Sequence, residues 1–166
     1  RPHSSRPAAP AWARLAILMA GPRIAVVIPA LDEEEAIGAV IREIPPVVHE
    51  VIVVDNGSRD GTAEAARAAG ATVVSEPRRG YGHACLAGIA AAGAADVLVF
   101  LDGDHSDFPA QLVEVVAPIL EGRADVVYGS RFLGGPHRTH MFWHFAANRF
   151  LTLVSNVFTN LNLSDM

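Results

Sequence analysis

The sequence "IAVVIPALDEEEAIGAVIREIPPVVHEVIVVD", residues 24–55, changes its hydrophobic pattern twice and indicates the fold class. Its two ends, 24–29 and 50–55, are short runs rich in β-branched residues, which favour strands. Asp32 and Glu35 stand three positions apart, as in a capping box, and predict that the intervening helix begins at Asp32. A strand, a helix and a second strand form the repeating unit of a parallel α/β sheet.

The same alternation continues along the chain. Further strands are predicted at 72–75, 96–102 and 125–129, and further helices from 60–62, after "RRGYG" (78–82) and from Pro109. We therefore expect an α/β fold, a three-layer sandwich with a mostly parallel central sheet. A last helix is predicted at 141–161 because its apolar residues recur every three or four positions. Core packing is the preferred interpretation of its apolar side, and contact with a membrane surface is the alternative.

The composition limits the domain organisation and the partners. The 166 residues suffice for one domain, which we place at 23–166 and expect to be truncated at its C-terminal end, with 1–22 as a leader, tag or disordered segment. A net charge of −5 disfavours nucleic acid as a partner. One cysteine and no lysine exclude, within these residues, an internal disulfide and a P-loop lysine. The apolar runs are far shorter than the ~20 residues of a membrane-spanning helix.

Acidic residues follow the predicted fourth strand in "VFLDGDHSD", residues 99–107. Asp102 and Asp104, with Gly103 allowing a close turn between them, are suited to hold a divalent cation that also coordinates a diphosphate. The cation would relieve the repulsion between the two carboxylates. Asp107 reads as a helix cap, whereas His105 and Ser106 either complete the metal shell or line the turn.

Other loops carry weaker signals, each with a structural alternative. Asp55 either accepts hydrogen bonds from a nucleobase or stabilises a local turn. "RRGYG" either binds a phosphate, base or ribose at a helix N-terminus or is simply a basic loop. For the histidines at 137, 140 and 144, a structural or acceptor-site role is favoured over zinc binding.

Five segments occur in an order that resembles one known family: "VVIPALDEE", "VIVVDNGSRDGT", "RRGYGHACLAG", "VFLDGDHSD" and "VVYGSR". Together they resemble the GT-A catalytic domain of family 2 glycosyltransferases, and most closely the dolichol-phosphate mannose synthase type. The resemblance covers about residues 23–166. It implies a GT-A, Rossmann-like fold and metal-dependent transfer of a hexose from a nucleotide-diphosphate sugar, such as GDP-mannose or UDP-glucose.

The resemblance also implies roles for individual residues. Asp102, Asp104 and Ser106 would hold Mg²⁺ or Mn²⁺. Arg131 would meet phosphate charge, and Asp165, beside Ser164, would face the acceptor. The nucleotide would be bound by Pro29, Ala30, Leu31, Glu33, Asp55, Ser58, Asp60, Arg79, Gly80 and Gly103.

The acceptor is the least determined element. The resemblance favours a polyprenyl (dolichyl or undecaprenyl) phosphate, whose ionised oxygen needs no strong base, and a cytoplasmic protein with peripheral contact at the inner face of the membrane. The alternatives are a transferase with a soluble acceptor, such as phosphoglycerate or a sugar hydroxyl, and an inactive nucleotide-sugar-binding fragment. With a hydroxyl acceptor, Asp165 would take the proton. An aspartate-nucleophile phosphatase and a dinucleotide-dependent dehydrogenase rank below these, because the lysine and the G-x-G-x-x-G motif that they use are missing.

Overall fold

The computed structural model describes residues 21–129 of the 166. The chain divides into two compact units, residues 1–125 and 126–166, and every strand described below belongs to the first. Several predictions concern residues outside the described range, 21–129. They are the helix at 141–161, the three histidines, and the roles of Arg131, Ser164 and Asp165. The boundary between residues 1–22 and a domain at 23–166 likewise stays a prediction.

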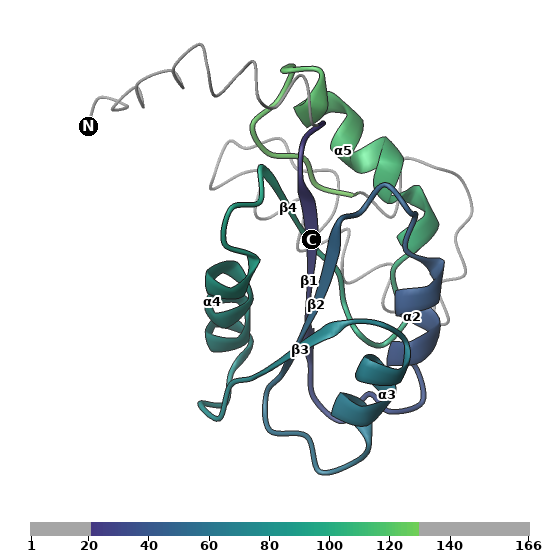
Figure 1. The fold of residues 1–166 in the computed structure, drawn as a ribbon, viewed down its shortest axis with the longest axis vertical. Helices are drawn as coiled ribbons and strands as arrows, with labels where there is room; N and C mark the ends of the chain where they lie inside the picture. Colours follow the sequence, from purple (N-terminus) through teal and green to yellow (C-terminus); the bar gives the residue numbers. More distant parts are fainter. Residues whose placement is uncertain (1–20, 130–166) are drawn as a thin grey trace, which may run out of the picture. The chain divides into compact units, whose positions relative to one another are not determined.

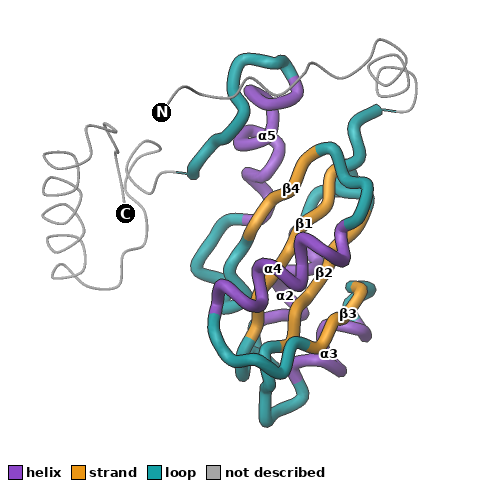
Figure 2. Tube along the Cα trace, turned by 90° about the vertical axis from the view of Figure 1, so that its left-hand side faces the viewer, coloured by secondary structure: helices purple, strands orange, loops and turns teal. Residues whose placement is uncertain are grey.

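Four parallel strands form the sheet, in the order β3-β2-β1-β4. They are β1 (Ile24–Ala30), β2 (Glu50–Asp55), β3 (Thr72–Ser75) and β4 (Val97–Phe100). Figure 2 shows the strands side by side with helices in front of and behind them. The predicted strands at 24–29, 50–55 and 72–75 and the centre of the one at 96–102 are confirmed.

Helices cover both faces of the sheet, which confirms the three-layer α/β arrangement. One face is covered by α4 (Tyr81–Ala92), and the other by α2 (Ile37–Glu43), α3 (Thr62–Ala68) and α5 (Leu112–Leu120), the last preceded by a short 3₁₀ turn, η1 (Pro109–Gln111) (Figure 1). The predicted starts near Thr62 and at Pro109 are confirmed, whereas α4 begins at Tyr81, inside "RRGYG" and two residues before its predicted start.

Successive residues of the central strands enter two separate hydrophobic clusters, because side chains of a strand point alternately to opposite faces. Ile24, Val26 and Ile28 of β1 pack toward α2, α3 and α5, whereas Ala25 and Val27 pack toward α4. All five are at most 2% exposed, so β1 is buried on both faces. A strand buried on both sides reads as a continuous apolar run, which is the pattern of "IAVVI".

The predicted start of the first helix is wrong. The first helix begins at Ile37, not Asp32, and no side chain caps it. Asp32 has φ = 58°, which is incompatible with a helical turn, and the carbonyl of Glu33 accepts the first hydrogen bonds, from Ala36 and Ile37.

The strand predicted at 125–129 is also absent. Residues 126–129 have no regular secondary structure, and Val126 and Tyr128 are 65% and 84% exposed. The sequence "DVVYG" therefore does not form a strand here, although its β-branched valines favour one.

Because all four strands run in the same direction, their carboxyl ends share one edge of the sheet, where ligands bind in open α/β folds. Four loops meet at that edge, following β1, β2, β3 and β4. Among the helices within residues 21–129, none combines the length and apolar character required to cross a membrane.

Candidate active site

The loops that follow β1 and β2 are joined by reciprocal hydrogen bonds. The backbone N–H of Asp32 donates to Ser58 Oγ (3.1 Å), and the backbone N–H of Arg59 donates to Asp32 Oδ1 (2.6 Å). The left-handed backbone at Asp32 lets one residue take part in both contacts. Ser58 and the segment that begins at Leu31 are thus held in a fixed relation to one another.

Thr62, the first residue of α3, is a buried residue that contacts both the loop after β1 and the loop after β2. It is fully buried, its Oγ1 accepts from the Glu33 N–H (2.8 Å), and its hydroxyl donates to Asp60 Oδ1. The other carboxylate oxygen of Asp60 accepts from the Glu34 N–H (3.2 Å). The hydrogen bond from Thr62 lowers the pKa of Asp60, which keeps this exposed carboxyl ionised.

Asp55 ends β2 beside Ala30, its partner in the register with β1. Its Oδ1 accepts from the Ser58 N–H (2.9 Å), which is the local turn contact that the sequence offered as an alternative to nucleobase binding. The Ser58 contact uses only one carboxylate oxygen of Asp55, so Asp55 can stabilise the turn and also accept a hydrogen bond from a nucleobase. Pro29 and Ala30 complete the end of β1, and Leu31, the next residue, is 42% exposed.

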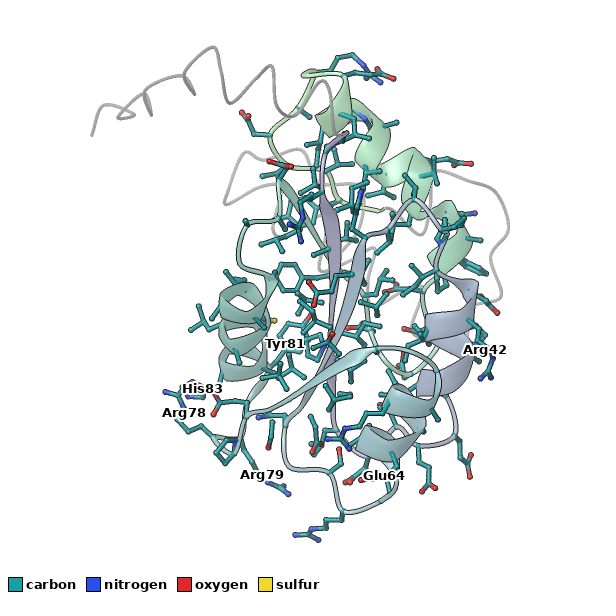
Figure 3. All side chains as sticks on the ribbon, in the orientation of Figure 1. Arg42, Glu64, Arg78, Arg79, Tyr81 and His83 are labelled. Atoms are coloured by element: carbon teal, nitrogen blue, oxygen red, sulfur yellow. The ribbon has the colours of Figure 1, made fainter. Side chains whose placement is uncertain are left out.

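The loop between β3 and α4 lies against the β2 loop. Arg79 Nη2 donates to the carbonyl of Gly57 (3.3 Å), and the Gly80 N–H donates to Asn56 Oδ1 (2.7 Å). Figure 3 shows the Arg78 and Arg79 side chains at this end of the molecule, beside the start of α4. Gly80 has φ = 129°, a conformation that favours glycine.

Arg78 is engaged within its own loop. Its guanidinium binds both oxygens of Glu76, Nε to Oε1 (3.0 Å) and Nη2 to Oε2 (2.8 Å). The Glu76 side chain is only 8% exposed, and the hydrogen bonds from Arg78 lower the pKa of Glu76 to about 2. Arg78 therefore shapes the loop, and Arg79 is the arginine that lies against the β2 loop.

The acidic loop after β4 contacts the β1 loop at its glycine. Gly103 is buried, and a Cβ at this position would lie 3.4 Å from Glu33 Cγ and 3.6 Å from Ile28 and Ile37 side-chain atoms. A larger side chain would separate Glu33 from the two aspartates. The absence of a side chain at Gly103 therefore lets the acidic loop lie close to Glu33.

Hydrogen bonds within the acidic loop define its shape. The Asp102 N–H donates to Asp107 Oδ2 (3.1 Å), which ends the pairing of β4, and the Ser106 N–H donates to Asp104 Oδ1 (2.9 Å). The prediction that Asp107 caps a helix is wrong, because the following turn has no side-chain cap and the carboxylate serves Asp102 instead. His105 Nε2 lies 3.1 Å from Glu43 Oε1, a contact that favours its turn-lining role.

Negative charge accumulates where the β1 and β4 loops meet. Burial, followed by the charges of Asp104, Asp60 and Asp102, raises the pKa of Glu33. Within the described part of the chain, no three histidine, cysteine, aspartate or glutamate side chains are grouped closely enough to hold a metal ion. The candidate metal ligands at this edge of the sheet are the carboxylates of Asp102 and Asp104, and their charges act on Glu33.

Tyr81 borders the same loop from the α4 side of the sheet (Figure 3). Partial burial, and after it the nearby Cys85 and Asp102, raise the pKa of Tyr81 to about 12. The phenol therefore stays protonated at neutral pH and keeps a hydrogen-bond donor near the acidic loop.

The structure brings together the predicted nucleotide and metal residues that it describes. Sequence reasoning missed three buried polar residues that fix their loops, Asn56, Thr62 and Glu76, which are 5%, 0% and 6% exposed. A weak signal existed for Asn56, since asparagine after a strand is typical of a turn. Nothing in the pattern indicated the distant partners: Asn56 bonds to residues 20 to 24 positions away, and Thr62 bonds to Glu33, 29 positions away.

Comparison with known proteins identifies the family. Residues 25–164 match the family described as glycosyl transferase family 2. The chain is 44% identical over 113 residues to an uncharacterised glycosyltransferase of Mycobacterium tuberculosis, covering 68% of this chain and 50% of that one. It is 42% identical over 128 residues to the glucosyl-3-phosphoglycerate synthase of Mycolicibacterium paratuberculosis, covering 68% of this chain and 39% of that one.

Solved structures of a glucosyl-3-phosphoglycerate synthase also match this chain. The crystal structure of Mycobacterium tuberculosis glucosyl-3-phosphoglycerate synthase matches with a TM-score of 0.57 and 39% identity, covering 66% of this chain and 44% of that one. The same enzyme, in complex with Mn²⁺, UDP-glucose and phosphoglyceric acid, matches with a TM-score of 0.57 and 38% identity, covering 72% and 46%.

The chain spans half or less of the length of these relatives. None of these relatives is described as a dolichol-phosphate mannose synthase, so the narrower resemblance gains no support, whereas the GT-A type of fold and the broader resemblance are confirmed. The chain belongs to glycosyl transferase family 2.

Proposed function

We propose that this chain forms the donor-binding part of a glucosyltransferase that uses UDP-glucose and a divalent cation, with a soluble phosphorylated hydroxy acid such as 3-phosphoglycerate as acceptor. The observation that carries the proposal is the meeting of the loops after β1 and β4, where Glu33 lies within the electrostatic reach of Asp102 and Asp104. A relative at 38% identity is solved with Mn²⁺, UDP-glucose and phosphoglyceric acid, which supports this choice of ligands.

The residues present fit Mg²⁺ or Mn²⁺. Carboxylate oxygens suit such hard cations, and Mg²⁺ typically takes only one or two protein carboxylates, with substrate phosphates and water filling the other positions. The small donor set of Asp102 and Asp104 agrees with this pattern, with Ser106 as the proposed third ligand. A cation would offset the negative charges that, after burial, raise the pKa of Glu33. When bound, the cation neutralises negative charge on the departing diphosphate.

The remaining residues would bind and orient the nucleotide. In this proposal Pro29, Ala30 and Leu31 form one wall of the nucleotide site, and Asp55 accepts hydrogen bonds from the base. Ser58, Asp60 and Glu33 hold the β1 and β2 loops in register through the hydrogen bonds described above. Arg79 and Gly80 flank the ribose or base, and Arg131 meets the phosphates.

The chemistry of the acceptor decides whether the reaction needs a general base. A hydroxyl acceptor must lose a proton as the new glycosidic bond forms, and Asp165 is the proposed general base. The competing proposal is a polyprenyl phosphate at the inner face of a membrane, which needs no base. It derives from the sequence resemblance alone, whereas the relatives named above support the soluble acceptor.

A transfer assay tests the proposal. The protein is incubated with UDP-[¹⁴C]glucose and Mn²⁺, in parallel with 3-phosphoglycerate, with undecaprenyl phosphate in detergent, and without acceptor. We expect labelled product with 3-phosphoglycerate that disappears on addition of EDTA. Transfer only to the lipid phosphate would overturn the acceptor assignment. The absence of UDP binding in calorimetry would overturn the donor assignment.

A further inference from the structure

The side chain of Asn56 connects two loops of the site with all of its strong hydrogen-bonding groups. Its Nδ2 donates to the carbonyls of Glu76 and Arg78, both at 2.8 Å, and its Oδ1 accepts from the Gly80 N–H at 2.7 Å. The residue is 5% exposed, so water does not replace these contacts easily. Three short hydrogen bonds therefore attach the end of β2 to the loop that carries Arg79.

The chemistry of this position requires an amide. Two carbonyls face one end of the side chain and an N–H faces the other, so donors and an acceptor must be present together. Aspartate has nearly the same shape but would place a carboxylate oxygen against both carbonyls, in a position that is 5% exposed. Serine lacks the second donor and is too short to span the gap.

The backbone on both sides of Asn56 is fixed as well. The Asn56 N–H donates to the carbonyl of Ala30 (3.0 Å), and the Glu76 N–H donates to the carbonyl of Asp55 (2.9 Å). The ends of β1 and β2 are therefore held together where Asn56 is attached, and the side chain of Asn56 ties the loop 76–80 to them. That loop positions Arg79, whose guanidinium reaches the carbonyl of Gly57 (3.3 Å).

We propose that Asn56 is a positioning residue that sets the affinity for the nucleotide by holding the loop 76–80, and with it Arg79, against the β2 loop. The inference rests on the proposed function, in which Arg79 and Gly80 flank the base or ribose. Asn56 acts through these residues and reaches neither the sugar nor the acceptor. Its loss therefore weakens nucleotide binding while the rate constant of the chemical step stays the same.

The test uses the full chain with N56D, N56S and a control, V116A. Val116 is 2% exposed in α5, in the hydrophobic cluster on the opposite face of the sheet from α4, and its truncation destabilises the fold without touching the clamp. The first measurement is limited trypsin digestion, because Arg78 and Arg79 are trypsin sites within the clamped loop. We expect N56D to be cleaved after these residues about tenfold faster than the wild type, with a smaller increase for N56S, and V116A to be unchanged there.

The second measurement is the Kd for UDP with Mn²⁺, together with KM and kcat for UDP-glucose. We expect N56D to raise Kd and KM about tenfold and N56S about threefold, with kcat within about twofold of the wild type. If N56D does not fold, N56S alone decides the question. Accelerated cleavage with unchanged Kd would overturn the role in affinity, and unchanged cleavage would overturn the clamp. If the wild type binds no UDP, the proposed function fails, and digestion still reports on the clamp.

Discussion

Substituting Gly88 by alanine tests how closely α4 packs on the sheet. A Cβ at Gly88 would lie 2.2 Å from Val27 Cγ1 and 3.2 Å from Val54 Cγ2, where a relaxed carbon–carbon contact is about 3.5–4.0 Å. Val27 is fully buried and β-branched, so its side chain has little freedom to turn away. The helix must therefore move outward, or the sheet must deform.

The magnitude follows from two opposing effects. Overpacking of a core costs about 1–3 kcal/mol, and a contact of 2.2 Å against a stiff neighbour belongs at the upper end. Alanine stabilises a helix by about 1 kcal/mol relative to glycine. We therefore expect G88A to lower the free energy of unfolding by about 2 kcal/mol, or Tm by roughly 6 °C for a chain of this size.

Gly82 provides the matched control in the same helix. A Cβ there would meet no atom within 4 Å, so G82A keeps the gain in helix propensity without the clash. Urea unfolding followed by circular dichroism should rank G82A at or above the wild type and G88A clearly below it. A G88A protein as stable as G82A would refute the close packing of α4 on β1 and β2.

Four further substitutions test the site. D102N and D104N each remove one charge at nearly constant size. Each should abolish Mn²⁺-dependent UDP binding in calorimetry and leave the melting curve unchanged. Wild-type affinity for UDP in either variant would count against the metal assignment. T62V keeps the volume of a fully buried residue but removes the hydroxyl that accepts from the Glu33 N–H and donates to Asp60, and should cost about 2 kcal/mol in urea unfolding. A loss below about 0.5 kcal/mol would show that these two hydrogen bonds contribute little. The pKa of Glu76 is about 2 in the folded protein against an ordinary value of 4.5, so its stabilising effect is complete above pH 4.5 and is lost as the pH falls toward 2. E76Q should therefore melt below the wild type at pH 7, with the difference narrowing by pH 3, and a difference independent of pH would disprove the role of the Arg78 ion pair.

The strands were predictable where burial on two faces produced continuous apolar runs. "IAVVI" and "VIVV" have this pattern because each strand is covered by helices on both sides. "DVVYG" has a similar composition, yet Val126 and Tyr128 are largely exposed. Local composition reports the tendency to extend, but it does not report whether a neighbouring strand is present.

The site was predictable as a set of strand-end loops but not in its internal connections. Asp32 matches a capping-box pattern, yet its carboxylate accepts from the Arg59 N–H, 27 positions away. Asp107 likewise looked like a cap and instead serves Asp102. Short polar side chains have several partners of similar energy, and the tertiary contacts that decide among them are invisible in a local pattern.

The central claim is that Asp102 and Asp104 hold a divalent cation against the diphosphate of the donor. Crystals grown with Mn²⁺ and UDP, measured at a wavelength where manganese scatters anomalously, test it most directly. The account predicts one anomalous peak coordinated by carboxylate oxygens of these two residues and by oxygens of both phosphates. A peak elsewhere, or UDP bound at this edge with those carboxylates turned away from any metal, would contradict it.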